Sequence, residues 1–368
     1  MSQQSNSVVV VSDVYGQRGG AYRVTSLLCR ALAEMDLKVT CFATWVDADS
    51  VTGDEGFEIV QPRFSHGSRW DIPNRVLARQ AQRGIEAKNP VAVFVVGLTK
   101  ICGHLLGSRV ADRLLVWELT NANPNNKFVD KTAANKLSRC LKVISPAATI
   151  DDGIRSTYSY TGEIARLPFW IEDEKISSNL PPADFEADFL FLARREDDKG
   201  LRELIRATAV LSKEISDLRV LIAGPGDATP YQTLANECGA SRAVSFCSLP
   251  SRQDAMQALS RCRFLVLPSY HEGYPLSLLE AAQYSIPVIA TDVGSIREVF
   301  GDCTGCCIIA PRDVESLTDA MKSRFKMETR DYITARRTIH QRFTELSSHT
   351  AVRDRLRKTL FDDVRTDG

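Results

Sequence analysis

The chain has 368 residues, of which 44% are hydrophobic and 25% charged, as in ordinary soluble globular proteins. This length exceeds one typical hydrophobic core and predicts two domains. Lys plus Arg and Asp plus Glu number 46 each, which excludes a global electrostatic attraction to nucleic acid or to acidic partners.

Neither a signal peptide nor a membrane span is expected. The first residues, MSQQSNS, are polar and lack a basic and an apolar region. The longest apolar runs, such as VAVFVVGL at 91–98, are too short to cross a bilayer and are typical of buried parallel strands. We therefore expect a cytoplasmic protein.

The N-terminal half alternates strands and helices. Its opening stretch predicts a strand at 8–12, a glycine-containing loop, a helix at about 20–35 and a strand at 38–44. Further strands are expected at 91–97, 114–119, 141–145 and 163–168. The polar stretch FWIEDEKISSNLPPADFEAD, with its pair of prolines, then predicts a linker at 169–188.

The alternation restarts after the linker. Strands are expected at 189–193, 218–224, 244–248, 263–269, 287–291 and 305–310. The pattern predicts an α/β protein with two doubly wound, Rossmann-like domains, at 1–168 and 189–345, which face a central cleft. A C-terminal helix at about 350–368 is a candidate to pack back on the first domain. Ligands are expected at the carboxyl ends of the strands.

Most of the ten cysteines lie singly in apolar runs and are interpreted as core residues. The CTGCC stretch at 303–307 contains a CxxC, but no second CxxC or His pair completes a zinc site. We expect these cysteines to be structural as well.

Two loops that follow predicted first strands carry candidate anion-binding groups. RGGA includes Gly19 and Gly20, which would let the backbone approach a ligand. LARREDDKG, at 192–200, presents Arg194, Arg195 and Lys199 together, and such cations bind phosphate. The alternative is a solvated turn with local ion pairs to the acidic residues 196–198.

A third loop, HEGYPLSLLEA at 271–281, carries two carboxylates. Gly273 loosens the loop, Pro275 suits a first helical turn, and backbone N–H groups there can hold a phosphate. We expect Glu280 about two turns along the helix, where it could accept hydrogen bonds from a vicinal diol such as a ribose. Glu272 would face a sugar attached to the phosphate. The alternative is an amphipathic helix with incidental glutamates.

The segment PSYHEGYPLSLLEAAQYSIPVIATDVGSIREV resembles the signature of retaining glycosyltransferase family 4, with its Glu-x7-Glu motif. FLFLARREDDKGLRELIRA, LRVLIAGPGD, GDCTGCCIIAPRDVESL and RGGA resemble other segments of that family. The resemblance implies a GT-B fold, with a nucleotide-sugar donor bound by the C-terminal domain and an acceptor on the N-terminal side. Ala193 stands where glycine is usual, and Glu118 where many members carry a histidine.

The resemblance also implies roles for single residues. Arg194 and Lys199 would bind the diphosphate, Glu280 the ribose and Glu272 the transferred sugar. The remaining implied contacts are backbone groups of Gly273, Tyr274, Pro275 and Leu276 at the diphosphate, Gly19 and Gly20 at the phosphate or acceptor, and residues 246–249 at the base.

The function implied is a retaining, metal-independent, hexosyltransferase-type enzyme. It would move a sugar from a nucleotide diphosphate sugar to a sugar, lipid-linked or small-molecule acceptor, as in cell-surface glycan or glycolipid synthesis, without a cofactor or metal. The alternative is a non-catalytic, transferase-like module that binds nucleotide, glycan or a partner, and Ala193 and Glu118 favour it. An epimerase of similar architecture does not explain the two glutamates. The residues leave the sugar, the base and the acceptor open.

The segment RFSHGSRWDIPNRVLARQAQRG, at 63–84, is locally basic. It contains Trp70, a lone acid, Asp71, and five arginines at 63, 69, 75, 79 and 83. Such a segment docks on an anionic membrane, grips an anionic acceptor, or is a solvated helix face. The first alternative would place the protein at the inner face of a membrane.

Overall fold

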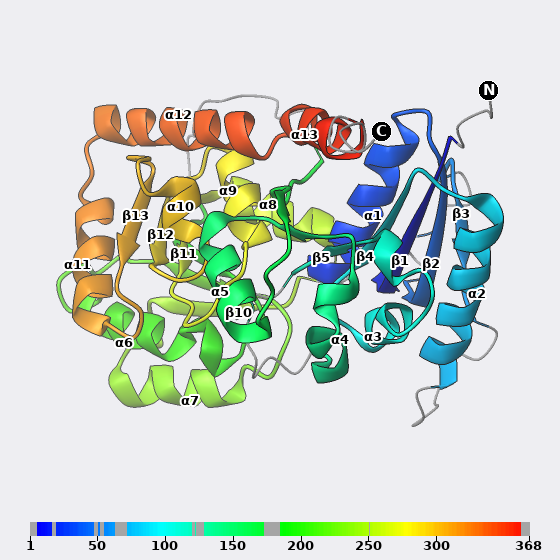
Figure 1. Ribbon diagram of the computed structural model, residues 1–368. Coiled ribbons are helices and arrows are strands. Elements are labelled where there is room, and N and C mark those ends of the chain that lie inside the picture. Colours follow the sequence, from blue (N-terminus) through cyan, green and yellow to red (C-terminus); the bar gives the residue numbers. More distant parts are fainter. Residues whose placement is uncertain are drawn as a thin grey trace. The chain divides into compact units, whose positions relative to one another are not determined.

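The computed structural model describes residues 6–16, 20–47, 51, 55–62, 72–119, 122, 129–172, 185–249 and 251–361. The chain divides into two compact units, Met1–Glu172 with His349–Gly368, and Asp173–Ser348. Each unit has a parallel sheet with helices packed around it (Figure 1). These two sheets confirm the prediction of two doubly wound α/β domains.

The sheet of the first unit has the strand order β3-β2-β1-β4-β5-β6-β7. Its strands are β1 Ser7–Tyr15, β2 Lys38–Val46, β3 Glu58–Val60, β4 Ala92–Val96, β5 Leu114–Trp117, β6 Lys142–Ser145 and β7 Ile164–Arg166. Its helices are α1 Gly20–Ala33, α2 Ile72–Lys88, α3 Lys100–Leu106, α4 Lys131–Asn135, α5 Ala148–Tyr158 and α13 His349–Phe361, with short 3-10 turns at Ala111–Arg113 and Leu137–Arg139.

The sheet of the second unit has the order β10-β9-β8-β11-β12-β13. Its strands are β8 Ala187–Leu192, β9 Val220–Ala223, β10 Val244–Cys247, β11 Cys262–Leu267, β12 Val288–Thr291 and β13 Cys306–Ile309. Its helices are the 3-10 helix η4 Asp197–Lys199, α6 Leu201–Leu211, α7 Thr229–Cys238, α8 Arg252–Ser260, α9 Leu276–Gln283, α10 Ile296–Phe300, α11 Val314–Phe325 and α12 Thr329–Leu346. The strand order reverses between β8 and β11, which makes their carboxyl ends the usual ligand position of such a sheet.

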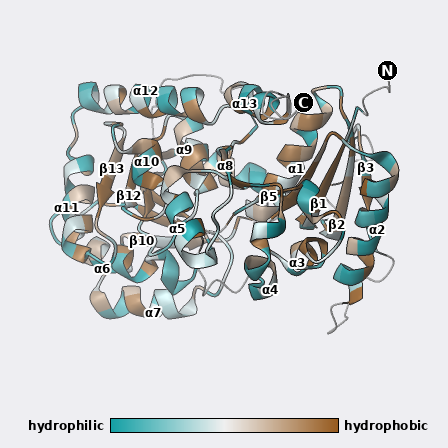
Figure 2. Cartoon of the chain, in the orientation of Figure 1, coloured by the Kyte–Doolittle hydropathy of each residue, from teal (hydrophilic) through white to brown (hydrophobic). Residues whose placement is uncertain are grey.

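Apolar strands form the two cores because both faces of each sheet are covered by helices. Residues 8–11 of β1 are fully buried, as are Phe189 and Phe191 of β8. Figure 2 shows the central strands mostly in brown, while helices such as α7 and α12 mix teal and brown turns. In the second core, Phe189 stacks on Phe264 of β11, with ring centroids 5.7 Å apart. Cys303 and Cys306 are also buried, as expected for structural cysteines.

The unit boundaries differ from the expected linker at 169–188. Phe169, Trp170 and Ile171 are buried, and the Trp170 ring stacks on Trp117 of the first unit at 5.7 Å. At the other end, β8 begins at Ala187. The apolar residues at both ends of the polar stretch therefore belong to the domains. The helix expected at about 350–368 is α13, which groups with the first unit.

The basic segment 63–84 lies only in part within the described residues. Its described part begins α2, where Arg75, Arg79 and Arg83 are exposed on successive turns. Residues 63–71 lie outside the described ranges. Among the helices that the structure describes, none combines the length and the apolar character that a membrane span needs.

Candidate functional site

The carboxyl ends of β8 and β11 bring two of the predicted site residues together. Lys199 ends the 3-10 helix η4 that follows β8, and Glu272 lies in the loop that follows β11. The Lys199 Nζ and Glu272 Oε1 atoms are 2.7 Å apart, and the two side chains are only 14% and 12% exposed. Ser269 Oγ donates a hydrogen bond to the same Glu272 oxygen at 2.7 Å. The cation and the carboxylate therefore form one preorganised pair.

Glycines allow the loops around this pair to touch backbone to backbone. Gly200 and Gly294 have φ angles of +68° and +57°. A Cβ atom at Gly200 would lie 1.9 Å from the Pro268 carbonyl oxygen, and one at Gly294 would lie 2.0 Å from that of Glu272. Only glycine fits such positions. The loops after β8, β11 and β12 are therefore fixed against each other.

Two tyrosines support the same loops. The Tyr270 N–H donates to the Asp198 carbonyl oxygen at 2.8 Å, and the Tyr231 hydroxyl donates to Asp197 Oδ1 at 3.0 Å. Burial and a hydrogen bond with Glu203 raise the pKa of Tyr270 to about 12. Burial and the hydrogen bond with Asp197 raise the pKa of Tyr231 to about 12 as well. Both phenols therefore stay neutral at physiological pH and hold η4 and the loop after β11.

The EGYPL loop, residues 272–276, leads into α9. Pro275 caps α9 and Leu276 is its first residue, so the first-turn N–H groups of the helix follow directly after the loop. Ser295 donates through its N–H and its hydroxyl to the Gly273 carbonyl oxygen, at 3.1 and 2.8 Å. The Tyr274 side chain is buried and its hydroxyl lies 3.0 Å from Ser347 Oγ. Tyr274 can therefore offer a ligand its backbone rather than its ring.

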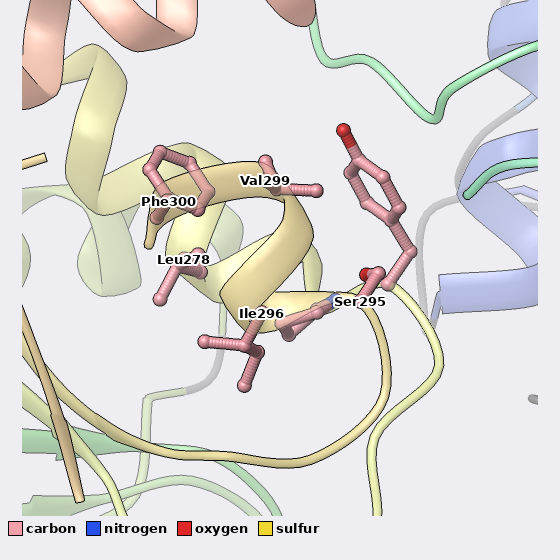
Figure 3. A pocket seen from close by; sticks show the side chains of 7 residues that line it. Leu278, Ser295, Ile296, Val299 and Phe300 are labelled. Atoms are coloured by element: carbon pink, nitrogen blue, oxygen red, sulfur yellow. The ribbon is translucent and has the colours of Figure 1, made fainter. Parts of the chain in front are cut away.

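A small apolar pocket lies behind this loop, between α9 and α10. Figure 3 shows Leu278 of α9 beside Ile296 and Phe300 of α10. The pocket has no room for a water molecule. It is a packing contact that holds α9 on α10, rather than a ligand site.

Glu280 differs from expectation in its position and its environment. It lies just over one turn into α9, not two, because the helix begins only at Leu276. It is 5% exposed, and its Oε1 atom is bound by the guanidinium group of Arg252, the first residue of α8. Glu280 is therefore a buried carboxylate held by an ion pair.

The adjacent arginines 194 and 195 point in different directions. The side chain of Arg194 is 46% exposed and pairs with Glu196, as the alternative of a solvated turn predicts. Arg195 is 7% exposed and donates to the carbonyl oxygens of Gly226, at 2.7 Å, and of Cys247. Arg195 thus connects the loops after β8 and β9 to the end of β10, where the expected base contacts at 246–249 lie.

The first unit carries the candidate residues Gly19, Gly20 and Glu118. Gly20 is the exposed first residue of α1, whereas Gly19 lies outside the described residues. Glu118 follows β5 and is buried. Its N–H donates to the Ile144 carbonyl oxygen at 2.9 Å, which extends the pairing with β6.

Ser269, Gly294 and Arg252 are among the site residues that the sequence analysis does not identify. Ser269 follows β11 and Gly294 follows β12. Their positions after predicted strands are the sequence feature that could have indicated a place in the site. Arg252 had no such signal, because it opens a helix 28 residues before its partner.

Residues 172–340 match the family model of glycosyl transferases group 1. The second unit contains a glycosyltransferase group 1 domain. The chain is 31% identical over 139 residues to a D-inositol 3-phosphate glycosyltransferase from Corynebacterium aurimucosum, a match that covers 36% of this chain and 33% of that protein. The chain thus spans about a third of the length of this curated relative. The group 1 domain includes Lys199, Glu272 and Glu280.

Solved structures resemble the whole chain, not only the group 1 domain. Sucrose-phosphate synthase from Thermosynechococcus elongatus superposes with a TM-score of 0.77 over 98% of this chain and 100% of its own, at 17% identity. HepE from Anabaena, solved in complex with UDP, superposes with a TM-score of 0.77 over 96% of this chain and 99% of its own, at 13% identity. These likenesses confirm the expected fold, a pair of Rossmann-like domains of the GT-B type.

Proposed function

We propose that the chain is a retaining glycosyltransferase that transfers a sugar from a nucleotide diphosphate sugar to an acceptor hydroxyl. The observation that carries this proposal is the largely buried Lys199–Glu272 pair at the switch point of a group 1 domain. Its cation lies where the sheet order predicts a ligand, and two helices, α6 and α9, begin beside it. HepE, of the same fold, has been solved in complex with UDP and with UDP-glucose.

The roles proposed for the residues follow from their charges. Lys199 and the first-turn N–H groups of α9 neutralise the diphosphate, and Arg194 joins them after leaving Glu196. Glu272 accepts hydrogen bonds from hydroxyl groups of the transferred sugar, while Lys199 and Ser269 hold one of its oxygens. Glu280 accepts hydrogen bonds from the ribose. Contacts of Gly19 and Gly20 with the phosphate or the acceptor, which the family resemblance implies, belong to the same proposal.

The proposed reaction needs no protein nucleophile. The bond between the anomeric carbon and the diphosphate oxygen breaks, and the acceptor oxygen bonds to that carbon on the same face. The acceptor's proton passes to the departing phosphate. The negative charge that builds on the phosphate is stabilised by Lys199, Arg194 and helix N–H groups, where other enzymes use a metal ion.

This mechanism predicts that transfer survives excess EDTA and that the product retains the anomeric configuration of the donor. The measurement is donor turnover with UDP-glucose, ADP-glucose and GDP-mannose, with and without EDTA, followed by NMR of the product's anomeric centre. Activity that EDTA abolishes and Mg²⁺ or Mn²⁺ restores would contradict the metal-free account. An inverted centre would contradict the proposed family mechanism.

Replacing Glu280 with alanine is expected to weaken nucleotide binding by ~1.5–3 kcal/mol, the usual contribution of a hydrogen bond to a charged group. Because Glu280 is buried and paired with Arg252, the same change should also lower stability. Glu280→Gln, which keeps the volume and one acceptor, separates the two effects. Calorimetric titration with nucleoside diphosphates measures the first, and thermal unfolding the second. Unchanged affinity in both variants would remove Glu280 from the site.

The alternative is a non-catalytic module that binds nucleotide or glycan, for which Ala193 and Glu118 stand as departures from the family pattern. A thermal-shift panel of nucleoside diphosphates and their sugars tests binding, because ligand at a hundred times its dissociation constant adds ~2.7 kcal/mol of stability. Stabilisation without any donor turnover or hydrolysis would favour the module. Stabilisation with turnover favours the transferase.

We also propose a sugar, lipid-linked or small-molecule acceptor. A further proposal is a peripheral contact of the segment 63–84 with an anionic membrane. The exposed Arg75, Arg79 and Arg83 on α2 support that contact.

A further inference from the structure

Arg252 and Glu280 form a largely buried ion pair in the second unit. Their side chains are 25% and 7% exposed, and the Arg252 Nη1 atom donates directly to Glu280 Oε1. A guanidinium group presents its donors in a rigid fork, so it fixes the direction of a carboxylate better than an ammonium group does. The pair is therefore a means of orienting Glu280.

The start of helix α8 also holds the backbone of Arg252 in place. Ser251 and Asp254 form a capping box, in which the Ser251 side chain accepts from the Asp254 N–H while Asp254 accepts from the Ser251 N–H. This box fixes Arg252 as the first residue of α8. Helix α8 connects β10 to β11 and packs against β8 and β11 (Figure 1). Its first residue, Arg252, contacts Glu280 of α9.

We propose that Arg252 is a positioning residue that makes the site selective for ribonucleotides. This inference rests on the proposed function and extends it. By binding Oε1, Arg252 turns the Glu280 carboxylate so that it meets the vicinal hydroxyl groups of a ribose at a defined angle. When a ligand lacks these hydroxyl groups, the buried Glu280 carboxylate gains no hydrogen bond from it, and the ligand binds more weakly. Selectivity for the ribose therefore depends on Arg252 although this residue need not touch the nucleotide.

The test compares the affinities of a ribonucleotide and of its counterpart without ribose hydroxyls. Calorimetric titrations of wild-type protein use UDP, ADP and GDP, each beside its 2′,3′-dideoxy form. We expect the wild type to prefer the better-binding ribonucleotide by roughly 10–100-fold. In Arg252→Gln this ratio should fall toward one, and Arg252→Lys should lie between the two. Glu280→Gln should show the same low ratio, and the double variant should lose nothing further.

Arg261→Gln is the matched control. Arg261 follows the last turn of the same helix and pairs with Glu186 on the surface, so its loss should leave the ratio at the wild-type value. A wild-type ratio in folded Arg252→Gln, even with lowered thermal stability, would show a structural role and overturn the inference. If Arg252→Gln does not fold, an unchanged ratio in Arg252→Lys overturns it.

The experiment separates the failure of this inference from failure of the proposed function. Wild-type protein that binds none of the nucleotides contradicts the donor site itself. Wild-type protein that binds ribo and dideoxy forms equally keeps the donor site but overturns the roles of Glu280 and Arg252.

Discussion

Lys199→Met is expected to lower donor turnover by about 10²–10³-fold, the usual effect of losing one preorganised charge partner. The substitution removes a cation that is 14% exposed and lies 2.7 Å from Glu272. Its charge would no longer meet the departing diphosphate, and Glu272 would keep only the Ser269 hydroxyl on Oε1. Turnover is measured as release of nucleoside diphosphate from the donor that stabilises the wild type most.

The control is Lys213→Met, because Lys213 is exposed just beyond the end of α6. Thermal unfolding of both variants should show that each retains its fold. Turnover of Lys199→Met within the range of the control would exclude Lys199 from the reaction. A selective loss with unchanged unfolding would support the proposed stabilisation of the leaving group.

Gly294→Ala is expected to lower the free energy of unfolding by about 2–5 kcal/mol, from left-handed backbone strain together with overpacking. The added Cβ would lie 2.0 Å from the Glu272 carbonyl oxygen, and backbone cannot move as cheaply as a side chain. Relief of this contact must displace the loop that carries Glu272. Nucleotide affinity should therefore fall together with stability.

Gly239→Ala provides the matched control. Gly239 also has a positive φ, of +80°, but a Cβ there meets nothing within 4 Å. Its substitution should cost only the backbone strain, about 1–2 kcal/mol, and leave nucleotide affinity intact. Urea denaturation gives both energies. Equal losses of stability in the two variants would contradict the backbone contact at Gly294.

Both sheets could be predicted because buried parallel strands are continuous apolar runs that alternate with amphipathic helices. Lys199 and Glu272 could each be placed at a strand end for the same reason. That they meet depends on β8 lying beside β11, and this neighbourhood follows from the strand order rather than from either motif. Contacts between distant parts of the chain therefore determine that Lys199 is the cation that pairs with Glu272.

At several positions the direction of the side chain could not be predicted from the sequence. Arg194 and Arg195 are identical neighbours, yet only the second turns inward, where it binds carbonyl oxygens of a loop after β9 and of the last residue of β10. The burial of Glu280 depends on an arginine from a different helix. The burial of Trp170 could not be predicted, because the apolar triplet at 169–171 stands beside many polar residues and is too short to show a periodic pattern.

The bridge made by Arg195 has a consequence for protein engineering. Its guanidinium group binds one backbone oxygen after β9 and one at the last residue of β10, while its own chain segment follows β8. Three chain segments therefore depend on one side chain. A transplant of a single loop from a protein of similar fold would break this bridge unless the new backbone offered a carbonyl oxygen at the same point. We therefore expect the proposed donor preference to change more readily when the three segments are exchanged together with Arg195 than when one of them is exchanged alone.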